Sequence, residues 1–190
     1  MNTFYSEEEL KNLGLKAYGE NVFISRNALL YNPEKLELGS NVRIDDFVTI
    51  SGNVKIGNYT HVAQFVSFYG GDAGIEMKDF SAVSSKSTVY ATSNDYSGLS
   101  MTNPMIPAKY KTTDKNAPVI FGKHVVVGCM SVILPGVEIG EGSSVGAMTL
   151  CTKSLDPWGI YAGIPAKKVK DRSKKILELE QQMKEDLGIK

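Results

Sequence analysis

The sequence contains few side chains that can accept a proton near neutral pH. Its two histidines are His61 and His124, and its two cysteines are Cys129 and Cys151. Histidine titrates between about pH 5 and 8, so His61 is a candidate base or proton relay, with an interface or surface role as the alternative. We expect a surface or structural role for His124. A zinc site with three histidine ligands needs one histidine more, so we expect no metal.

The element that must position these side chains is a repeat of six residues. An aliphatic or aromatic residue recurs at every sixth position from Leu38 to Phe68 and from Phe121 to Cys151. This period fits neither a helix nor a plain strand, but it fits a three-sided coil of about 18 residues with small residues at its corners. Stacked coils form parallel strands. The sequence therefore predicts an all-β fold, a left-handed parallel β-helix, because the hairpin turns of a β-sandwich are missing.

Two interruptions break the repeat. Nine residues rather than six lead from Phe68 to Met77, so the glycine-rich segment 70–74 contains a three-residue insertion. Residues 95–117 lack the repeat and contain Pro104 and Pro107, which predicts one long protruding loop. Long loops on rigid scaffolds often carry function.

Both ends of the chain are predicted to be helical. Ser6 and Glu9 form a capping box that starts a short N-terminal helix, and Gly14 ends this helix. From Asp171 onward, apolar residues recur at three- and four-residue steps, which indicates an amphipathic C-terminal α-helix. We expect it to cover the open end of the β-helix or a neighbouring subunit. The prediction is a single domain, 1–190, with a helical segment at 1–20, the β-helix at 21–155, its loop at 95–117, and a C-terminal segment and helix at 156–190.

The composition excludes several partners. The 21 basic and 21 acidic residues cancel, so no net field attracts nucleic acid or an anionic membrane. No apolar run reaches the roughly 18 residues of a membrane span, so we expect no membrane insertion. The N-terminal residues do not follow a signal-peptide pattern, and two cysteines are too few for a disulfide framework. We expect a cytoplasmic location.

Three segments of the repeat region resemble a known superfamily. They are GKHVVVG at 122–128, ILPGVEIG at 133–140 and YAGIPAK at 161–167, and they are similar to the hexapeptide-repeat acyltransferases. Tyr5-Ser6 with Glu9-Leu10, and the run at 95–104, resemble sugar acyltransferases of surface-polysaccharide pathways. The enzymes that acylate dTDP-4-amino-4,6-dideoxyglucose are among these.

The resemblance implies a homotrimer in which each acyl-CoA lies in a groove between neighbouring subunits. Acetyl-CoA or another acyl-CoA would be the co-substrate, and the acceptor would be a sugar linked to a nucleotide. Lysines would face the coenzyme phosphates, and small residues would let the pantetheine arm approach the backbone. The implied coenzyme contacts are Cys129, Ala147, Thr152, Lys153, Lys167 and Lys170.

The chemistry of the acceptor follows from a departure from the family pattern. Many relatives that acylate hydroxyls have a histidine where the loop leaves the repeat, but residues 91–96 contain none. An amine with a pKa of roughly 8 is partly unprotonated at pH 7 and attacks a thioester without a strong base. We therefore expect N-acylation, with Asp95, Ser84 and Asn94 orienting and desolvating the amine. An amide such as that of Asn94 holds an amine but cannot take its proton.

Two alternatives remain open at this point. A sugar O-acetyltransferase would need His61 or Asp95 as its base. A non-catalytic β-helix that serves as a trimerisation scaffold would need neither the long loop nor the terminal YAGIPAK segment. A measurement of coenzyme A binding would distinguish the scaffold hypothesis from the two enzyme hypotheses, because only an enzyme needs to bind the coenzyme.

Overall fold

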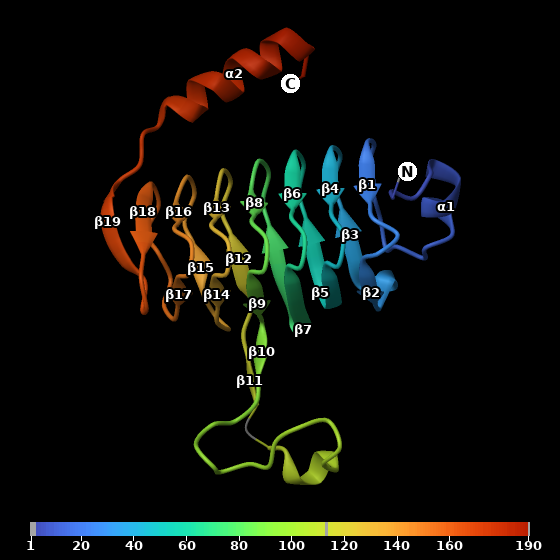
Figure 1. The fold of residues 1–190 in the computed structure, drawn as a ribbon, viewed down its shortest axis with the longest axis vertical. Helices are drawn as coiled ribbons and strands as arrows, with labels where there is room; N and C mark the ends of the chain where they lie inside the picture. The colour runs from blue at the N-terminus through green and yellow to red at the C-terminus, as the bar shows by residue number, and fades with distance from the viewer. Residues whose placement is uncertain (1–2, 113, 190) are drawn as a thin grey trace.

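A computed structural model describes residues 3–112 and 114–189. The repeat region winds into a left-handed prism of parallel strands with three flat faces (Figure 1). Met1, Asn2 and Lys190 of the predicted domain, and Thr113 of the predicted loop, lie outside the described residues. The predicted all-β parallel β-helix is confirmed.

We call the sheet that contains His61 the first face. Its strands follow one another along the prism in chain order, and the last one pairs antiparallel. They are β1 (Val22–Ile24), β4 (Val42–Ile44), β6 (Thr60–Val62), β8 (Ala82–Val83), β13 (Val126–Val127), β16 (Ser144–Val145), β18 (Gly159–Ala162) and β19 (Lys167–Asp171).

The second and third faces share two long strands that bend across a corner, β5 (Thr49–Ile56) and β7 (Ser67–Met77). The second face also contains β2 (Leu29–Tyr31), β9 (Thr88–Tyr90), β14 (Val132–Ile133) and β17 (Leu150–Cys151). The third face adds β3 (Leu36–Leu38), β12 (Val119–Phe121) and β15 (Glu138–Ile139), with the 3-10 turn η1 (Pro33–Lys35) before it. We call the corner between the first and second faces the first edge. The corner between the second and third faces is the second edge, and the corner between the third and first faces is the third edge.

The strand register confirms the coil length. Val42 pairs with Thr60 and Val126 with Ser144, each 18 residues further along the chain. His61 pairs with Ala82, which is 21 residues further, because this coil contains the three-residue insertion. The insertion lies inside β7, where the pairing with β5 shifts register at Gly52.

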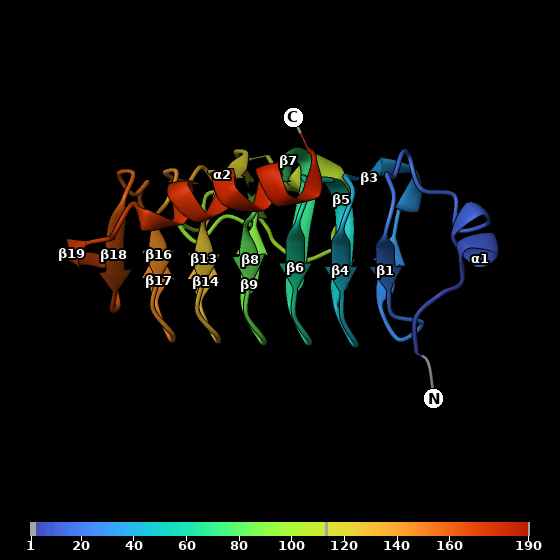
Figure 2. The same cartoon turned by 90° about the horizontal axis from the view of Figure 1, so that it is seen from above.

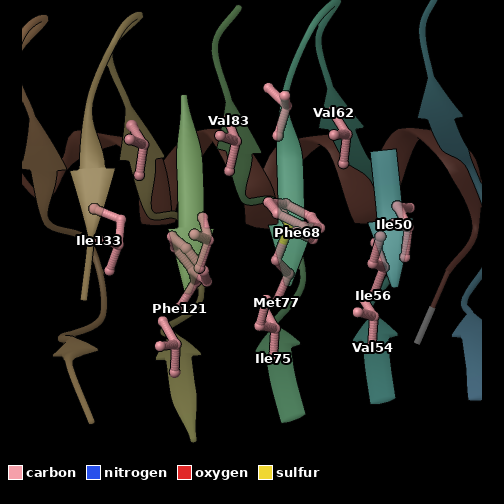
Figure 3. Close-up of a cluster of buried hydrophobic side chains, with 14 of the residues drawn as sticks. Ile50, Val54, Ile56, Val62, Phe68, Ile75, Met77, Val83, Phe121 and Ile133 are labelled. Carbon is pink, nitrogen blue, oxygen red and sulfur yellow. The ribbon is translucent and has the colours of Figure 1, made fainter. Parts of the chain in front are cut away.

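The interior is filled by the repeat's anchor residues. Phe68, Phe121, Ile44 and Ile133 are among the fully buried side chains, and Figure 3 shows such residues stacked in rows along the prism axis. The small residues at the corners are buried as well. Their hydroxyls donate to backbone carbonyls of the same coil or of a neighbouring one, as when Ser81 Oγ donates to Lys78 O at 2.6 Å and Ser87 Oγ to Gly128 O at 3.0 Å. This removes the cost of unpaired buried carbonyls.

The two helices differ in part from expectation. Helix α1 (Glu7–Lys11) has the capping box of Ser6 and Glu9, but it ends at Lys11 with Asn12 as its C-cap, so the predicted end at Gly14 is wrong. Asn12 satisfies the last turn with its own N–H, and the positive φ of Gly14, 70°, serves the following turn.

Helix α2 (Lys175–Leu187) confirms the C-terminal helix, but it runs back alongside the prism (Figure 2). The expectation that it covers the open end is wrong, because β19 pairs with β18 at that end. Its contact with a neighbouring subunit remains a prediction. None of the described helices is long and apolar enough to cross a membrane.

Candidate active site

The long loop leaves the prism at the second edge. Its stem is a short hairpin of β10 (Thr92–Ser93) and β11 (Lys115–Asn116), and its far part contains the 3-10 turn η2 (Ala108–Tyr110) (Figure 1). Asn94 directly follows the stem, and its side chain is exposed. This position leaves the amide accessible to a ligand or a neighbouring subunit at the second edge.

Asp95 shapes the loop itself. Its carboxylate accepts hydrogen bonds from Ser97 Oγ at 2.7 Å and from the backbone N–H groups of Ser97, Leu99 and Ser100 at 2.8 to 3.0 Å. The hydrogen bonds from Ser97, followed by those from the other N–H groups, lower the pKa of Asp95 to about 2. So acidic a group is a weak base, and a contact between Asp95 and an acceptor stays a prediction.

His61 belongs to a cluster at the first edge. Its Nε2 lies 2.8 Å from Oδ2 of Asp45, and Arg43 Nε donates to Oδ1 of the same carboxylate at 2.7 Å. Burial would raise the pKa of Asp45, but the hydrogen bonds from Arg43 and His61 outweigh it and lower this pKa. Asp45 is therefore ionised at neutral pH.

Ser84 lies at the same edge, one coil further along. Strand register places His61 opposite Ala82, and the Ser84 N–H donates to Val127 O at 2.9 Å. Its side chain is half-buried. Ser84 and His61 share the first edge, whereas Asn94 lies beyond the second face, so one chain alone does not bring all three together.

The residues implied as coenzyme contacts fall into two groups in the last coils. Cys129 and Ala147 are exposed neighbours at the first edge, where a side chain on Gly128 would lie 2.5 Å from the Ala147 nitrogen. Thr152, Lys153 and Lys167 line a cavity of about 300 Å³. Lys170 follows on β19, opposite Ile160. All residues that line this cavity lie between Thr152 and Lys167, and the cationic side chains among them suit an anionic ligand.

His124 has the structural role expected of it. Its side chain is only 8% exposed, its Nε2 lies 2.7 Å from Oε2 of Glu180 in α2, and its ring stacks on Phe80. It does not reach the first edge.

Asp45, the partner of His61, was not identified from the sequence. The two residues are 16 positions apart, two fewer than the 18 of one coil, so the columns of the repeat do not pair them and the repeat carries no signal for this contact. The role of Arg43 had no signal in the sequence. Within residues 3–112 and 114–189, no three His, Cys, Asp or Glu side chains gather where they could hold a metal ion.

Comparisons with known proteins identify close relatives, although no family model matches the sequence. The chain is 39% identical over 180 residues to dTDP-4-amino-4,6-dideoxy-D-glucose acyltransferase of Escherichia coli, which covers 93% of both chains. It is 30% identical over 146 residues to the putative lipopolysaccharide biosynthesis O-acetyl transferase WbbJ of Escherichia coli K12, covering 72% of this chain and 69% of WbbJ.

The structure superimposes on solved ones. With AntD, an N-acyltransferase from Bacillus cereus in complex with dTDP and 3-hydroxybutyryl-CoA, it shares a TM-score of 0.96 and 49% identity, over 99% of this chain and all of that one. Other AntD structures carry substitutions at its positions 84 and 94, a serine and an aspartate. This chain is an acyltransferase that belongs to the family of the dTDP-4-amino-4,6-dideoxy-D-glucose acyltransferases, and the resemblance read from its hexapeptide repeat is confirmed.

Proposed function

We propose that this chain transfers the acyl group of an acyl-CoA to the amine of a dTDP-linked 4-amino-4,6-dideoxy sugar. The observation that carries the proposal is the near-complete match to AntD, which binds dTDP-4-amino-4,6-dideoxyglucose together with coenzyme A. The structure is compatible with this chemistry, because the base of the loop presents an amide, Asn94, and the neutral hydroxyl of Ser84 lies at the first edge.

Ser84 and Asn94 are the proposed contacts of the reacting groups. Because the two chains match over nearly their whole length, we infer that positions 84 and 94 of AntD correspond to Ser84 and Asn94 here. Asn94 replaces an aspartate, so this chain holds the amine by a neutral hydrogen bond rather than by an ion pair. A neutral partner does not favour the charged ammonium form, which is the unreactive one.

The proposed assembly is a homotrimer. Rows of outward-facing side chains support it, because the second-face row through Thr49, Ser67 and Thr88 carries no charge. The third-face row contains Glu37, Lys55 and Glu76 in a chain of ion pairs, as expected of a solvated face. Interface cores are depleted in charge, so face two suits contact with a neighbour better than face three does.

The first edge also carries exposed apolar side chains, which supports contact with neighbouring subunits. Four large side chains on it are at least half exposed: Phe47, Phe65, Met130 and Met148. If this edge points to a three-fold axis, a neighbour's second edge lies beside the first face. We infer that the neighbour's loop crosses this groove, so that its Asn94 approaches Ser84 and completes a site that one chain lacks.

The coenzyme would lie along this groove, with its phosphates near Lys153, Lys167 and Lys170 and its thioester toward Ser84. Small residues at the first edge, such as Ala147, let a pantetheine arm reach backbone amides. We place the reaction in the cytoplasm, where both an acyl-CoA and a nucleotide sugar are available.

A thiol-release assay tests the proposal. Purified protein is mixed with acetyl-CoA, and separately with 3-hydroxybutyryl-CoA, against dTDP-4-amino-4,6-dideoxyglucose and its 4-hydroxy counterpart. We expect release with the amino sugar and sedimentation as a trimer. Thiol release with the hydroxy sugar alone would favour O-acylation. If calorimetry detects binding of neither acyl-CoA, the remaining interpretation is a non-catalytic scaffold.

A further inference from the structure

We propose that Asp45 is a positioning residue that holds His61 as the proton acceptor for the attacking amine, an inference that rests on the proposed N-acyl transfer. Asn94 cannot take a proton and Asp95 is committed to its loop, so neither supplies this step. The pair at the first edge can supply it.

Burial distinguishes the two partners. The Asp45 side chain is 7% exposed and is held from two sides, by His61 Nε2 at 2.8 Å and by Arg43 Nε at 2.7 Å. The guanidinium of Arg43 is fixed in turn, 5.2 Å above the ring of Phe4. The His61 side chain is 45% exposed. A fixed carboxylate therefore orients an imidazole that a substrate can reach.

The pairing selects one tautomer of His61. An ionised carboxylate only accepts hydrogen bonds, so neutral His61 must carry its proton on Nε2. The lone pair of Nδ1 is then available, and Nδ1 has no hydrogen-bond partner among residues 3–112 and 114–189. In the Ser-His-Asp triad a carboxylate likewise sets the tautomer of a catalytic histidine, there by accepting from Nδ1–H so that Nε2 acts as the base.

The imidazole lies close to the proposed reaction site. Strands β4, β6 and β8 are neighbours on the first face (Figure 2), and His61 pairs with Ala82, two residues before Ser84. From a strand spacing of about 4.8 Å and two residues of strand, the Cα atoms of His61 and Ser84 are roughly 8 Å apart.

The proposed reaction transfers the acyl group in two steps. The neutral amine nitrogen forms a bond to the thioester carbonyl carbon, and the resulting ammonium proton moves to Nδ1 of His61. The carbon–sulfur bond then breaks, and the departing coenzyme thiolate takes that proton from the imidazolium. The products are the N-acyl sugar and free coenzyme A, and His61 returns to its starting form.

A spectroscopic test of the positioning needs no substrate. Nitrogen-15 NMR of the trimer at pH 8 reports the tautomer of His61. We expect the Nε2–H form in the wild type, and a shift toward Nδ1–H in Asp45→Asn, because the new amide can donate to Nε2. The matched control is Asp79→Asn, which changes a carboxylate at the third edge that accepts from the Asn58 N–H at 2.7 Å. An unchanged tautomer in folded Asp45→Asn overturns the positioning role.

Kinetics then test the proton transfer. We expect Asp45→Asn to lower kcat about 10- to 100-fold with KM nearly unchanged, and Asp79→Asn to leave both unaltered. Should Asp45→Asn fail to fold, His61→Asn decides the question, because its side chain is half exposed. Wild-type kcat and an unchanged pH–rate profile in His61→Asn would refute the inference. A wild type that acylates no amino sugar would instead refute the proposed function, while the tautomer measurement still stands.

Discussion

The protein has two histidine–carboxylate pairs of nearly equal length at two edges of one prism. His61 lies 2.8 Å from Asp45 at the first edge, and His124 lies 2.7 Å from Glu180 at the third. Their exposed fractions differ: the His61 side chain is 45% exposed and that of His124 only 8%. Under our proposal, the same contact serves catalysis where the imidazole is exposed and packing where it is buried.

The His124 pair is also covered by more neighbouring side chains than the His61 pair. His124 stacks on Phe80, which stacks on Tyr59, and Lys123 and Lys184 also bind Glu180. These contacts tie α2 to the prism. The first edge has no such cover in the described chain, so a neighbouring subunit can approach it.

Exchanging each histidine for asparagine gives the largest expected effect. His61→Asn should lower kcat about 100-fold, since general base catalysis contributes at least that factor. His124→Asn should leave kcat within about twofold and lower the unfolding temperature instead. Thiol release and thermal unfolding of both variants check this, and equal losses of kcat would abolish the functional difference between the pairs.

Removing the carboxylate at the third edge should release α2. Glu180→Ala leaves His124 and Lys123 without their buried partner, which costs about 3 kcal/mol. We expect faster amide hydrogen exchange throughout α2, with the strands of the prism unchanged. Glu178→Ala, at an exposed position of the same helix, is the control, and equal exchange in the two variants would contradict the role of Glu180.

Acid should act on α2 in the same way. Burial would raise the pKa of Glu180, but hydrogen bonds from Lys123, Lys184 and His124 outweigh it and lower this pKa from 4.5 to about 2. A lowered pKa means that the contribution is complete above about pH 4.5 and is lost as the pH falls toward 2. NMR spectra of α2 at pH 5, 3.5 and 2 should show docked, partly docked and released helix. Release already at pH 5 would contradict this.

The smallest effect concerns backbone conformation. Lys86 at the first edge and His124 at the third have positive φ angles of 62° and 60°. Lys86→Gly should stabilise the protein by about 0.5 kcal/mol, because glycine adopts this conformation without strain. His124→Gly should destabilise it, because the packing and the ion pair are lost. Chemical denaturation measures both, and a loss in Lys86→Gly would show that its side chain has a contact.

The fold was predictable because each coil repeats the same physical rule. Inward residues such as Phe68 and Phe121 recur with the register of the strands, so the periodicity alone predicts parallel stacking. The path of α2 was not predictable, since an amphipathic pattern shows that a helix has an apolar face but not which surface it covers.

The candidate site was predictable only in part. Ser84 and Asn94 were found from the resemblance and from the edge of the repeat, but Asp45 was not recognised as the partner of His61. Its side chain reaches from the corner of one coil to the strand of the next, and spacing within the repeat does not encode that direction. The four hydrogen bonds of Asp95 depend on the loop backbone, which has no periodicity.

The regular strand spacing also fixes distances along the prism axis. Starting at Ser84, successive coils lead through Gly128 and Gly146 to Ala162, and β19 with Lys167 lies one strand beyond. At about 4.8 Å per strand, four steps separate Ser84 from Lys167 by roughly 19 Å. Adding or deleting one coil between them would change this span by a fixed increment, while the length of coenzyme A stays constant. If Ser84 and Lys167 contact the coenzyme as proposed, its length constrains the number of coils between them, whereas coils before the one with Arg43 and Asp45 are free to vary.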